Sequence, residues 1–283
     1  LTQYSSYFMP QNSLEHFIIG SQLAQATGLR HALELNRTRW PECTGVLYYK
    51  MNDNYPAASW SCADWYGAPK ISHYICQDAF SPLHACAIFS KLNPMGQEIA
   101  LPIFLLDDAD ALAGANWRVL VRAYNGALQE TKRQEFLGSG SIDHLAKLGD
   151  FNLTGEASAS VPLLIVVETH KDRTLVGRTF YWANFEAKQG CLMELPRTRL
   201  TMSTEDDSVH VANVGTLPAV GVYIQRPGHA HTFLASDNYF WLDSGESVEI
   251  SVNATDGLTI EAWNADRHGG ENHACDWDGP RKA

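Results

Sequence analysis

The sequence predicts a mainly β protein in which a helix–strand–helix unit precedes two immunoglobulin-like β-sandwich domains. Three observations predict this order. Apolar residues recur at helical spacing in residues 13–37, and a second helix is expected at 69–80. An apolar, β-prone segment, 45–51, lies between these helices. From about residue 83 onward, β-prone segments of four to eight residues alternate with turn signals such as Asn125-Gly126, which is the pattern of a sandwich.

The first helix is expected to begin at Ser13, a residue type that caps helix N-termini, and Glu15 follows in its first turn. The segment 45–51 ends abruptly in polar and aromatic residues, and the chain then turns at Pro56. It reaches the second helix after Tyr66-Gly67. Functional side chains at the carboxyl end of a strand that precedes a helix are typical of (β/α)8 enzymes.

The remaining chain divides by its strand pattern. We expect a first sandwich at 82–190, a second sandwich at 191–266 and a loosely held polar tail at 267–283. The first is predicted to contain a helical crossover near 141–148 and strands at 84–90, 100–106, 117–124, 133–137, 161–169 and 175–183. The second is predicted to contain strands at 197–203, 207–213, 218–225, 230–234, 247–252 and 257–263.

The bulk composition fits a folded protein and excludes some partners. Of the 283 residues, 45% are hydrophobic and 19% charged, and the net charge is −11. This charge argues against nucleic acid or an anionic membrane as the partner. Six cysteines without CxxC spacing are typical of free thiols in a reducing compartment, so a cytoplasmic location is expected. Glycosylation sequons at Asn36, Asn152 and Asn253 leave a secreted or lysosomal location open.

Several motifs resemble a known enzyme family. Residues 45–56, with Ser59-Trp60-Ser61 and 64–67 after them, resemble the last strand and helix of the catalytic barrel of glycoside hydrolase family 2, closest to the β-mannosidase branch. Residues 13–26 resemble the preceding barrel helix, and 195–198, 215–221 and 236–246 resemble the last domain of such enzymes. The resemblance implies that 1–81 is the C-terminal remnant of a (β/α)8 barrel, cut from a longer chain that does not begin at Leu1.

The resemblance also implies a retaining, exo-acting β-glycosidase that hydrolyses terminal β-glycosides of oligosaccharides without a cofactor. Such an enzyme needs two carboxyl groups about 5–5.5 Å apart. This chain has no Asn-Glu dipeptide of the kind that carries the family's acid/base, and Glu15, Glu34 and Glu42 lie on or beside a helix. We therefore expect no catalytic residue in this chain, which should be inactive alone.

Other readings stay open at this point. A β-galactosidase, β-glucuronidase or exo-glucosaminidase would fit the same motifs, and two sandwiches could instead form a non-catalytic carbohydrate-binding or adhesion module. The expected partners are the substrate, bound by the full enzyme, and the missing N-terminal catalytic part. Residues 1–81 should pack on the first sandwich or on another chain, which includes a homo-oligomer.

Four residues are candidates for substrate binding. Tyr49 takes the place of a family tryptophan, and the resemblance implies that this aromatic ring packs beneath the sugar. The alternative is that Tyr49 packs in the core of the barrel. Asn52 and Asp53 match the family's Asn-Asp, although an aspartate before a turn is often a structural hydrogen-bond acceptor. Trp60 is expected to wall the pocket or to lie in a core. Lys70 begins a helix and is expected to be solvated.

No metal site is expected. The pair His229 and His231 has the strand spacing of metal ligands, but the acidic ligand expected four or five residues later is absent. His268, His273 and Cys275 in the tail have irregular spacing. No glycine-rich phosphate loop and no serine nucleophile elbow is present.

Overall fold

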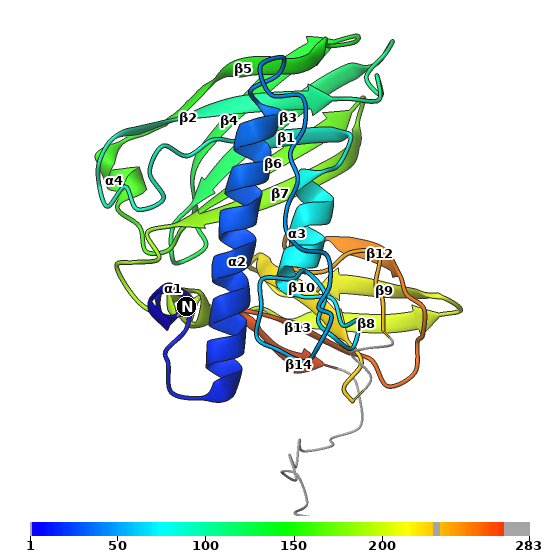
Figure 1. Ribbon diagram of the computed structural model, residues 1–283. Helices are drawn as coiled ribbons and strands as arrows, with labels where there is room; N and C mark the ends of the chain where they lie inside the picture. Colours follow the sequence, from blue (N-terminus) through cyan, green and yellow to red (C-terminus); the bar gives the residue numbers. More distant parts are fainter. Residues whose placement is uncertain (1, 229–232, 269–283) are drawn as a thin grey trace, which may run out of the picture.

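The computed structural model describes residues 2–228 and 233–268, which form a mainly β protein with four antiparallel sheets (Figure 1). Its helices are α1 (Thr2–Phe8), α2 (Leu14–Arg37), α3 (Ile71–Ala79), the one-turn α4 (Gly155–Ser158) and the 3-10 helix η1 (Cys191–Glu194). Among the described helices, none is both long and apolar enough to span a lipid bilayer.

Two sheets face each other in the first sandwich. One has the strand order β1-β2-β5 and the other β4-β3-β6-β7. Their shared core is filled by large apolar side chains such as Leu101, Ile103, Val121 and Phe151. The bounds are β1 (Leu83–Ala87), β2 (Ile99–Asp107), β3 (Asn116–Tyr124), β4 (Glu130–Ser139), β5 (His144–Leu153), β6 (Leu163–Lys171) and β7 (Thr174–Ala183). The six strands predicted in this part are therefore present.

The helical crossover predicted near 141–148 is wrong, because strand β5 begins at His144. This strand pairs with β2 in an antiparallel register that runs from Ile99 opposite Leu153 to Asp107 opposite His144. Pairing along a whole neighbouring strand outweighs a weak local helical pattern. Phe151 and Leu153 become fully buried as a result.

The second sandwich also has a three-stranded sheet, β12-β9-β8, and a four-stranded sheet, β11-β10-β13-β14. Strand β14 pairs with β13 and extends to His268, two residues into the predicted tail. Part of the predicted strand 230–234 and the rest of the tail lie outside the described residues. The bounds are β8 (Leu200–Glu205), β9 (Ser208–Asn213), β10 (Ala219–Gln225), β11 (Phe240–Leu242), β12 (Ser247–Ser251), β13 (Thr259–Ala262) and β14 (Ala265–His268).

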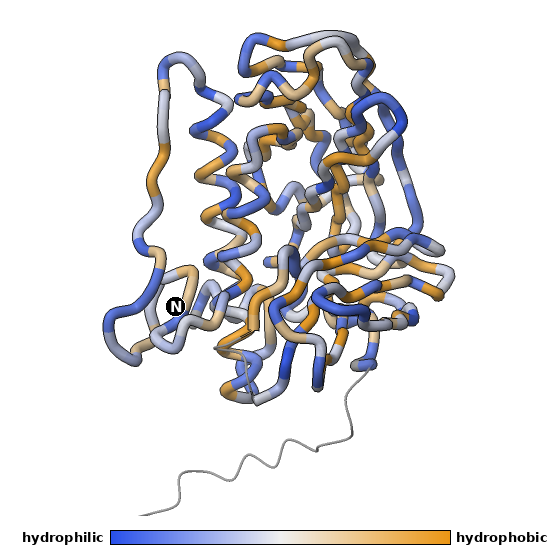
Figure 2. Tube along the Cα trace, turned by 90° about the vertical axis from the view of Figure 1, so that its right-hand side faces the viewer, coloured by the Kyte–Doolittle hydropathy of each residue, from blue (hydrophilic) through white to orange (hydrophobic). Residues whose placement is uncertain are grey.

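Helix α2 begins as predicted, because the Ser13 hydroxyl accepts a hydrogen bond from the backbone N–H of His16 at 3.1 Å. The helix runs alongside both sandwiches (Figure 1). Hydrophobic positions recur along the helices and strands with hydrophilic positions between them (Figure 2). Where the helices and the two sandwiches meet, they share a core rich in aromatic side chains, including Phe180, Trp182, Trp241 and Trp263.

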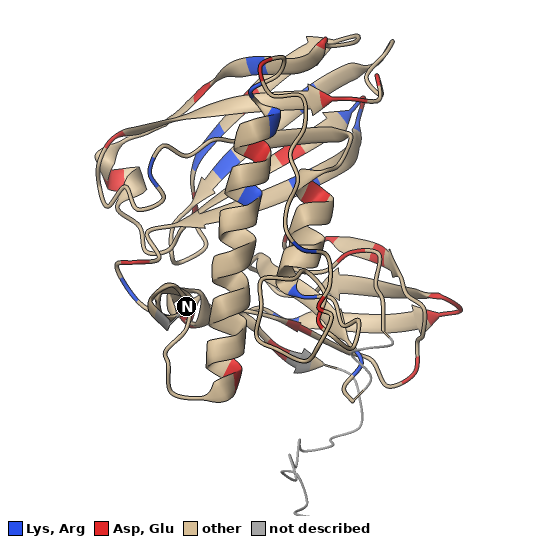
Figure 3. Ribbon diagram, in the orientation of Figure 1, with Lys and Arg blue, Asp and Glu red and all other residues tan. Residues whose placement is uncertain are grey.

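A charged network also joins the two sandwiches. Arg178 of β7 donates to both carboxylate oxygens of Glu246, at 2.7 and 3.0 Å, and to Glu168 of β6 at 2.8 Å. Arg122 of β3 contacts Glu168 at 2.6 Å and Asp243 at 2.8 Å. Elsewhere, basic and acidic residues are interspersed over the first sandwich (Figure 3).

The strand predicted at 45–51 is not formed, and α2 is joined to α3 by an irregular segment. A strand exists through hydrogen bonds to a neighbouring strand. Among the described residues, the backbone of 45–51 has no strand beside it; the nearest ladder element is the single bridge between Asn52 and Ala63. The local prediction therefore fails for want of a partner strand.

Candidate functional site

The segment 45–51 keeps the alternation of a strand in its side chains. Val46 and Tyr48 are half-buried, whereas Leu47, Tyr49 and Met51 are 98%, 75% and 52% exposed. Successive side chains of an extended chain point to opposite sides. Val46 and Tyr48 pack on an apolar cluster beneath the segment, formed by Leu29, Leu33, Cys62, Cys76 and Ala79. One face of the segment is thus covered by α2 and α3, and the other is open.

Asp53 lies at the end of this segment and is buried. Its carboxylate accepts hydrogen bonds from the hydroxyls of Ser59 and Ser61, the latter at 2.7 Å. Ammonium groups lie at 3.0 Å (Lys50) and 3.7 Å (Lys70). The hydroxyl donors, aided by the two lysines, hold the pKa of Asp53 well below its usual value, against the effect of burial. Asp53 is therefore ionised at neutral pH and fully engaged within the protein.

Backbone contacts fold the chain back onto the same segment. The N–H of Cys62 lies 3.1 Å from the carbonyl of Lys50 and 3.0 Å from that of Met51, and Ala63 donates to Met51 at 2.8 Å. The N–H of Lys70 in turn donates to the carbonyl of Cys62 at 2.9 Å. These bonds bring residues 50–53 and 59–63 together and place their exposed side chains on one surface.

The four predicted substrate-binding residues divide into two kinds. Tyr49, Asn52 and Trp60 are exposed, so neither aromatic lies in a core in this structure, and Trp60 is 64% exposed. Its carbonyl accepts a hydrogen bond from Gln25 of α2 at 2.6 Å, which fixes the loop to the helix. Asp53 is buried beneath them and organises the loop. Further exposed aromatics nearby in sequence are Tyr55, Trp65 and Tyr66.

Sequence reasoning missed the residues that hold Asp53. Lys70 was expected to be solvated, and this is wrong: its ammonium donates to the Ser61 hydroxyl at 2.8 Å and to the Ser59 carbonyl at 3.2 Å. The signal available in the sequence is the spacing of Ser59 and Ser61, because two hydroxyls two residues apart in extended chain lie on one side. The chemistry of this surface is that of a polar, aromatic platform, which suits sugar rings with their C–H faces and hydroxyls.

One buried group elsewhere has the composition of a metal site. The ligating atoms of Glu34, His84 and Cys86 lie within 4.8 Å of one another in the described part of the chain. The Glu34 carboxylate already accepts from the Tyr181 hydroxyl at 2.9 and 3.0 Å and contacts His84 Nε2 at 2.9 Å. The guanidinium of Arg30 lies 3.9 Å away and opposes a second cation. These contacts indicate a hydrogen-bonded network that anchors α2 to the first sandwich.

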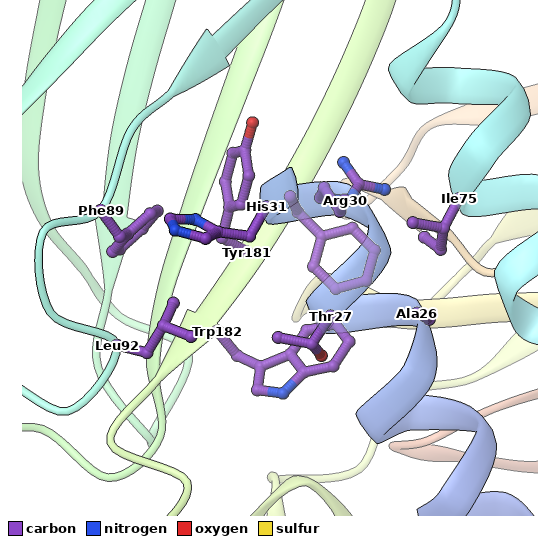
Figure 4. A pocket seen from close by; sticks show the side chains of 10 residues that line it. Ala26, Thr27, Arg30, His31, Ile75, Phe89, Leu92, Tyr181 and Trp182 are labelled. Carbon is purple, nitrogen blue, oxygen red and sulfur yellow. The ribbon is translucent and has the colours of Figure 1, made fainter. Parts of the chain in front are cut away.

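Two hollows in the described part of the chain are lined by residues other than Tyr49. One, with a volume of about 30 Å³, is lined mainly by apolar side chains between α2 and the first sandwich, among them Phe89, Leu92 and Trp182 (Figure 4). It has room for about one or two water molecules. A wider hollow of about 420 Å³ lies beside Trp40 and His144, at the far end of the segment. The pair His229 and His231, with His273 and Cys275, lies outside the described residues.

Parts of the chain are similar in sequence to known proteins. Residues 194–267 match the Ig-fold domain of mannosidases. A segment of 75 residues is 33% identical to β-mannosidase B of Thermothelomyces thermophilus and corresponds to 25% of this chain and 9% of that protein. The resemblance to the C-terminal part of a β-mannosidase-like enzyme of glycoside hydrolase family 2 is confirmed.

Solved structures share the fold over almost the whole chain. An exo-chitosanase from Amycolatopsis orientalis superposes with a TM-score of 0.75 at 16% identity, over 91% of this chain and 35% of its own. A β-D-mannosidase from Dictyoglomus thermophilum superposes with a TM-score of 0.69 at 18% identity, over 93% of this chain and 31% of its own. The chain thus spans about a third of the length of these enzymes.

Proposed function

We propose that this chain is the C-terminal portion of a retaining, exo-acting β-glycosidase that hydrolyses terminal β-glycosides of oligosaccharides. Residues 1–81 would complete a (β/α)8 barrel, and the two sandwiches would buttress it. Both catalytic carboxylates would lie in sequence outside these residues, so the chain alone would be inactive. Tyr49, Asn52 and Trp60 would contribute to the sugar pocket, and Asp53 would hold their loop in place.

The observation that carries this proposal is the exposure pattern of 45–51. In a (β/α)8 barrel, helices cover the outer face of each strand and the inner face points into a packed interior. Here α2 and α3 cover Val46 and Tyr48, while the side chains of Leu47 and Tyr49 are largely exposed. A stripe of large apolar side chains is rarely left in water without a partner. The interior of a barrel would supply that partner.

Two candidate substrates follow from the similar enzymes. The solved structures include an exo-chitosanase, which one of its titles calls an exo-β-D-glucosaminidase, and a β-D-mannosidase. The similarity of 194–267 to mannosidases favours a β-mannoside. Tyr49 departs from the family's tryptophan, which keeps a β-glucosaminide as the second candidate.

The direct test is hydrolysis of p-nitrophenyl β-glycosides of mannose, glucosamine, galactose and glucuronic acid. The 283-residue chain and the full open reading frame that encodes it should be assayed side by side. We expect turnover only by the longer protein. Turnover by the 283-residue chain would refute the placement of the carboxylates. Sugar binding by the chain without turnover by either protein would favour a non-catalytic carbohydrate-binding module.

A second test examines the barrel without any sugar. Leu47→Asp should leave the 283-residue chain unchanged in stability, because the side chain is 98% exposed there. In the longer protein the same substitution would bury a carboxylate in an apolar interior and cost several kcal/mol, roughly 3 or more. The exposed Leu137→Asp in β4 is the matched control and should be mild in both proteins. Equal effects of Leu47→Asp in both proteins would refute the barrel placement.

A further inference from the structure

Two cysteines meet beneath the candidate site. The sulfur of Cys62, in the loop that carries Trp60, lies 4.0 Å from the sulfur of Cys76 in α3. Both side chains are buried in the apolar cluster under residues 45–51. All five described cysteines are free thiols. Among them, the sulfurs of Cys62 and Cys76 contact each other.

The surroundings favour a thiolate at Cys62. The hydrogen bond that Cys62 shares with the neighbouring Cys76 thiol lowers the pKa of Cys62 below its ordinary value near 9 in spite of burial. The nearby hydroxyl of Tyr48 and the positive charge of Lys70 act in the same direction. The same coupling raises the pKa of Cys76. One member of the pair is thus prepared as a nucleophile, and the second retains its proton.

We propose that Cys62 and Cys76 are a dithiol modification site that forms a reversible disulfide by exchange with a low-molecular-weight disulfide such as oxidised glutathione. The Cys62 thiolate attacks one sulfur of the small disulfide, forms a mixed disulfide and releases one thiolate. Cys76 gives its proton to water, attacks the Cys62 sulfur and releases the second small thiolate. Two protein thiols are oxidised, and one small disulfide is reduced to two thiols.

The geometry permits this bond with a small adjustment. The sulfurs must approach by about 2 Å to reach the length of a disulfide, which is within the range of side-chain rotation and a slight loop shift. The small disulfide reaches the pair when the loop opens, and the loop contains no helix or strand between Thr38 and Lys70. The product would fasten the loop that carries Asn52, Asp53 and Trp60 to α3 and so restrict its motion.

The test is oxidation of the 283-residue chain with oxidised glutathione, followed by alkylation of the remaining thiols and digestion without reductant. Trypsin should yield residues 51–70 linked to 71–91. Cleavage after Phe80 by chymotrypsin then separates Cys76 from Cys86 and assigns the bond. Chymotrypsin cleavage of the folded, oxidised chain at the exposed Tyr49 and Trp60 should be at least about tenfold slower than that of the reduced chain.

Matched variants separate this pair from the other thiols. Cys62→Ser should abolish the linked peptide, and Cys43→Ser should retain it, although Cys43 is the more exposed thiol. A wild-type chain in which Cys62 and Cys76 are both alkylated after oxidation would overturn the proposal. A bond from Cys62 to any other cysteine, or equal chymotrypsin cleavage of the oxidised and reduced chains, would do so as well.

Discussion

Replacement of Arg178 by methionine should loosen the junction between the two sandwiches. Methionine keeps the apolar stem but removes the bidentate contact with Glu246 and the bond to Glu168. The Arg178 side chain is 13% exposed and that of Glu246 is 29% exposed, so both charges are partly desolvated. Removal of one partner of a buried pair costs about 3–5 kcal/mol.

The lower end of that range applies to Arg178. Glu168 keeps Arg122 as a partner, and Glu246 still accepts from the backbone N–H of Asp243 at 2.9 Å. We therefore expect a loss of about 3 kcal/mol in the free energy of unfolding. Arg133→Met is the matched control, because Arg133 also makes a bidentate pair, with Glu130, but at a surface where the side chains are 53% and 31% exposed. Its loss should stay below about 1 kcal/mol.

Urea unfolding followed by tryptophan fluorescence measures both variants, since Trp241 lies at the junction and its backbone carbonyl accepts from Arg178. A double-mutant cycle with Glu246→Gln isolates the pair and should return a coupling of about 1–3 kcal/mol. If Arg178→Met costs no more than Arg133→Met, or if the coupling is zero, the network does not stabilise the junction and the reasoning from burial fails.

Three further predictions follow from single contacts. Burial raises the pKa of Asp243, but the contact with Arg122 outweighs burial, and the pKa lies below its usual value. The stability that this carboxylate contributes should be complete above about pH 4 and should be lost as the pH falls through its folded-state pKa. Asp243→Asn should therefore flatten the acid limb of the free energy of unfolding, measured by urea unfolding at a series of pH values. Gly28→Ala should stabilise α2 by about 0.5–1 kcal/mol, because there is open space around the new methyl group. Gly20→Ala should destabilise the protein in the same thermal scan, because its methyl group would meet the Ser5 carbonyl oxygen at 2.6 Å. Equal effects of the two substitutions would contradict the contact between α1 and α2. Tyr49→Ala should lower kcat/KM of the longer protein roughly tenfold and should leave the stability of the 283-residue chain unchanged, because the side chain is exposed there. Tyr49→Phe should keep most of the activity. An unchanged kcat/KM in Tyr49→Ala would exclude stacking of Tyr49 on the sugar.

Local patterns were sufficient for much of the fold. Helix α2 begins at the predicted serine cap, because capping and helical periodicity are both properties of neighbouring residues. Strands such as β3 and β7 were found in the same way, from short β-prone segments between turn signals. Strand β5 was missed because its conformation is set by nine paired positions on β2, which is distant in sequence.

The candidate site was only partly predictable. The motif at 49–53 marked a candidate segment, and the structure places Tyr49 and Asn52 on an exposed surface, so their role in substrate binding stays a prediction. The partners of Asp53 were not predictable from its neighbours, because the chain must fold back from residue 53 to residues 59–61 and 70 before the hydroxyls and ammonium groups converge. Lysine usually lies at the protein surface, and Lys70 is half-buried here because the chain folds back between residues 53 and 70.

The failed strand and the proposed barrel have one physical origin. The sequence of 45–51 encodes two faces, and the structure shows that the face carrying Val46 and Tyr48 finds its partner in α2 and α3. The backbone of 45–51 has no neighbouring strand among the described residues, so no ladder forms, and the side chains of Leu47 and Tyr49 stay in water. A segment that served as a surface loop would not need large apolar residues at alternate positions on its open side. The alternation is therefore best explained by a second partner that supplies both strand edges and an apolar interior, which is what the neighbouring strands of a closed barrel provide.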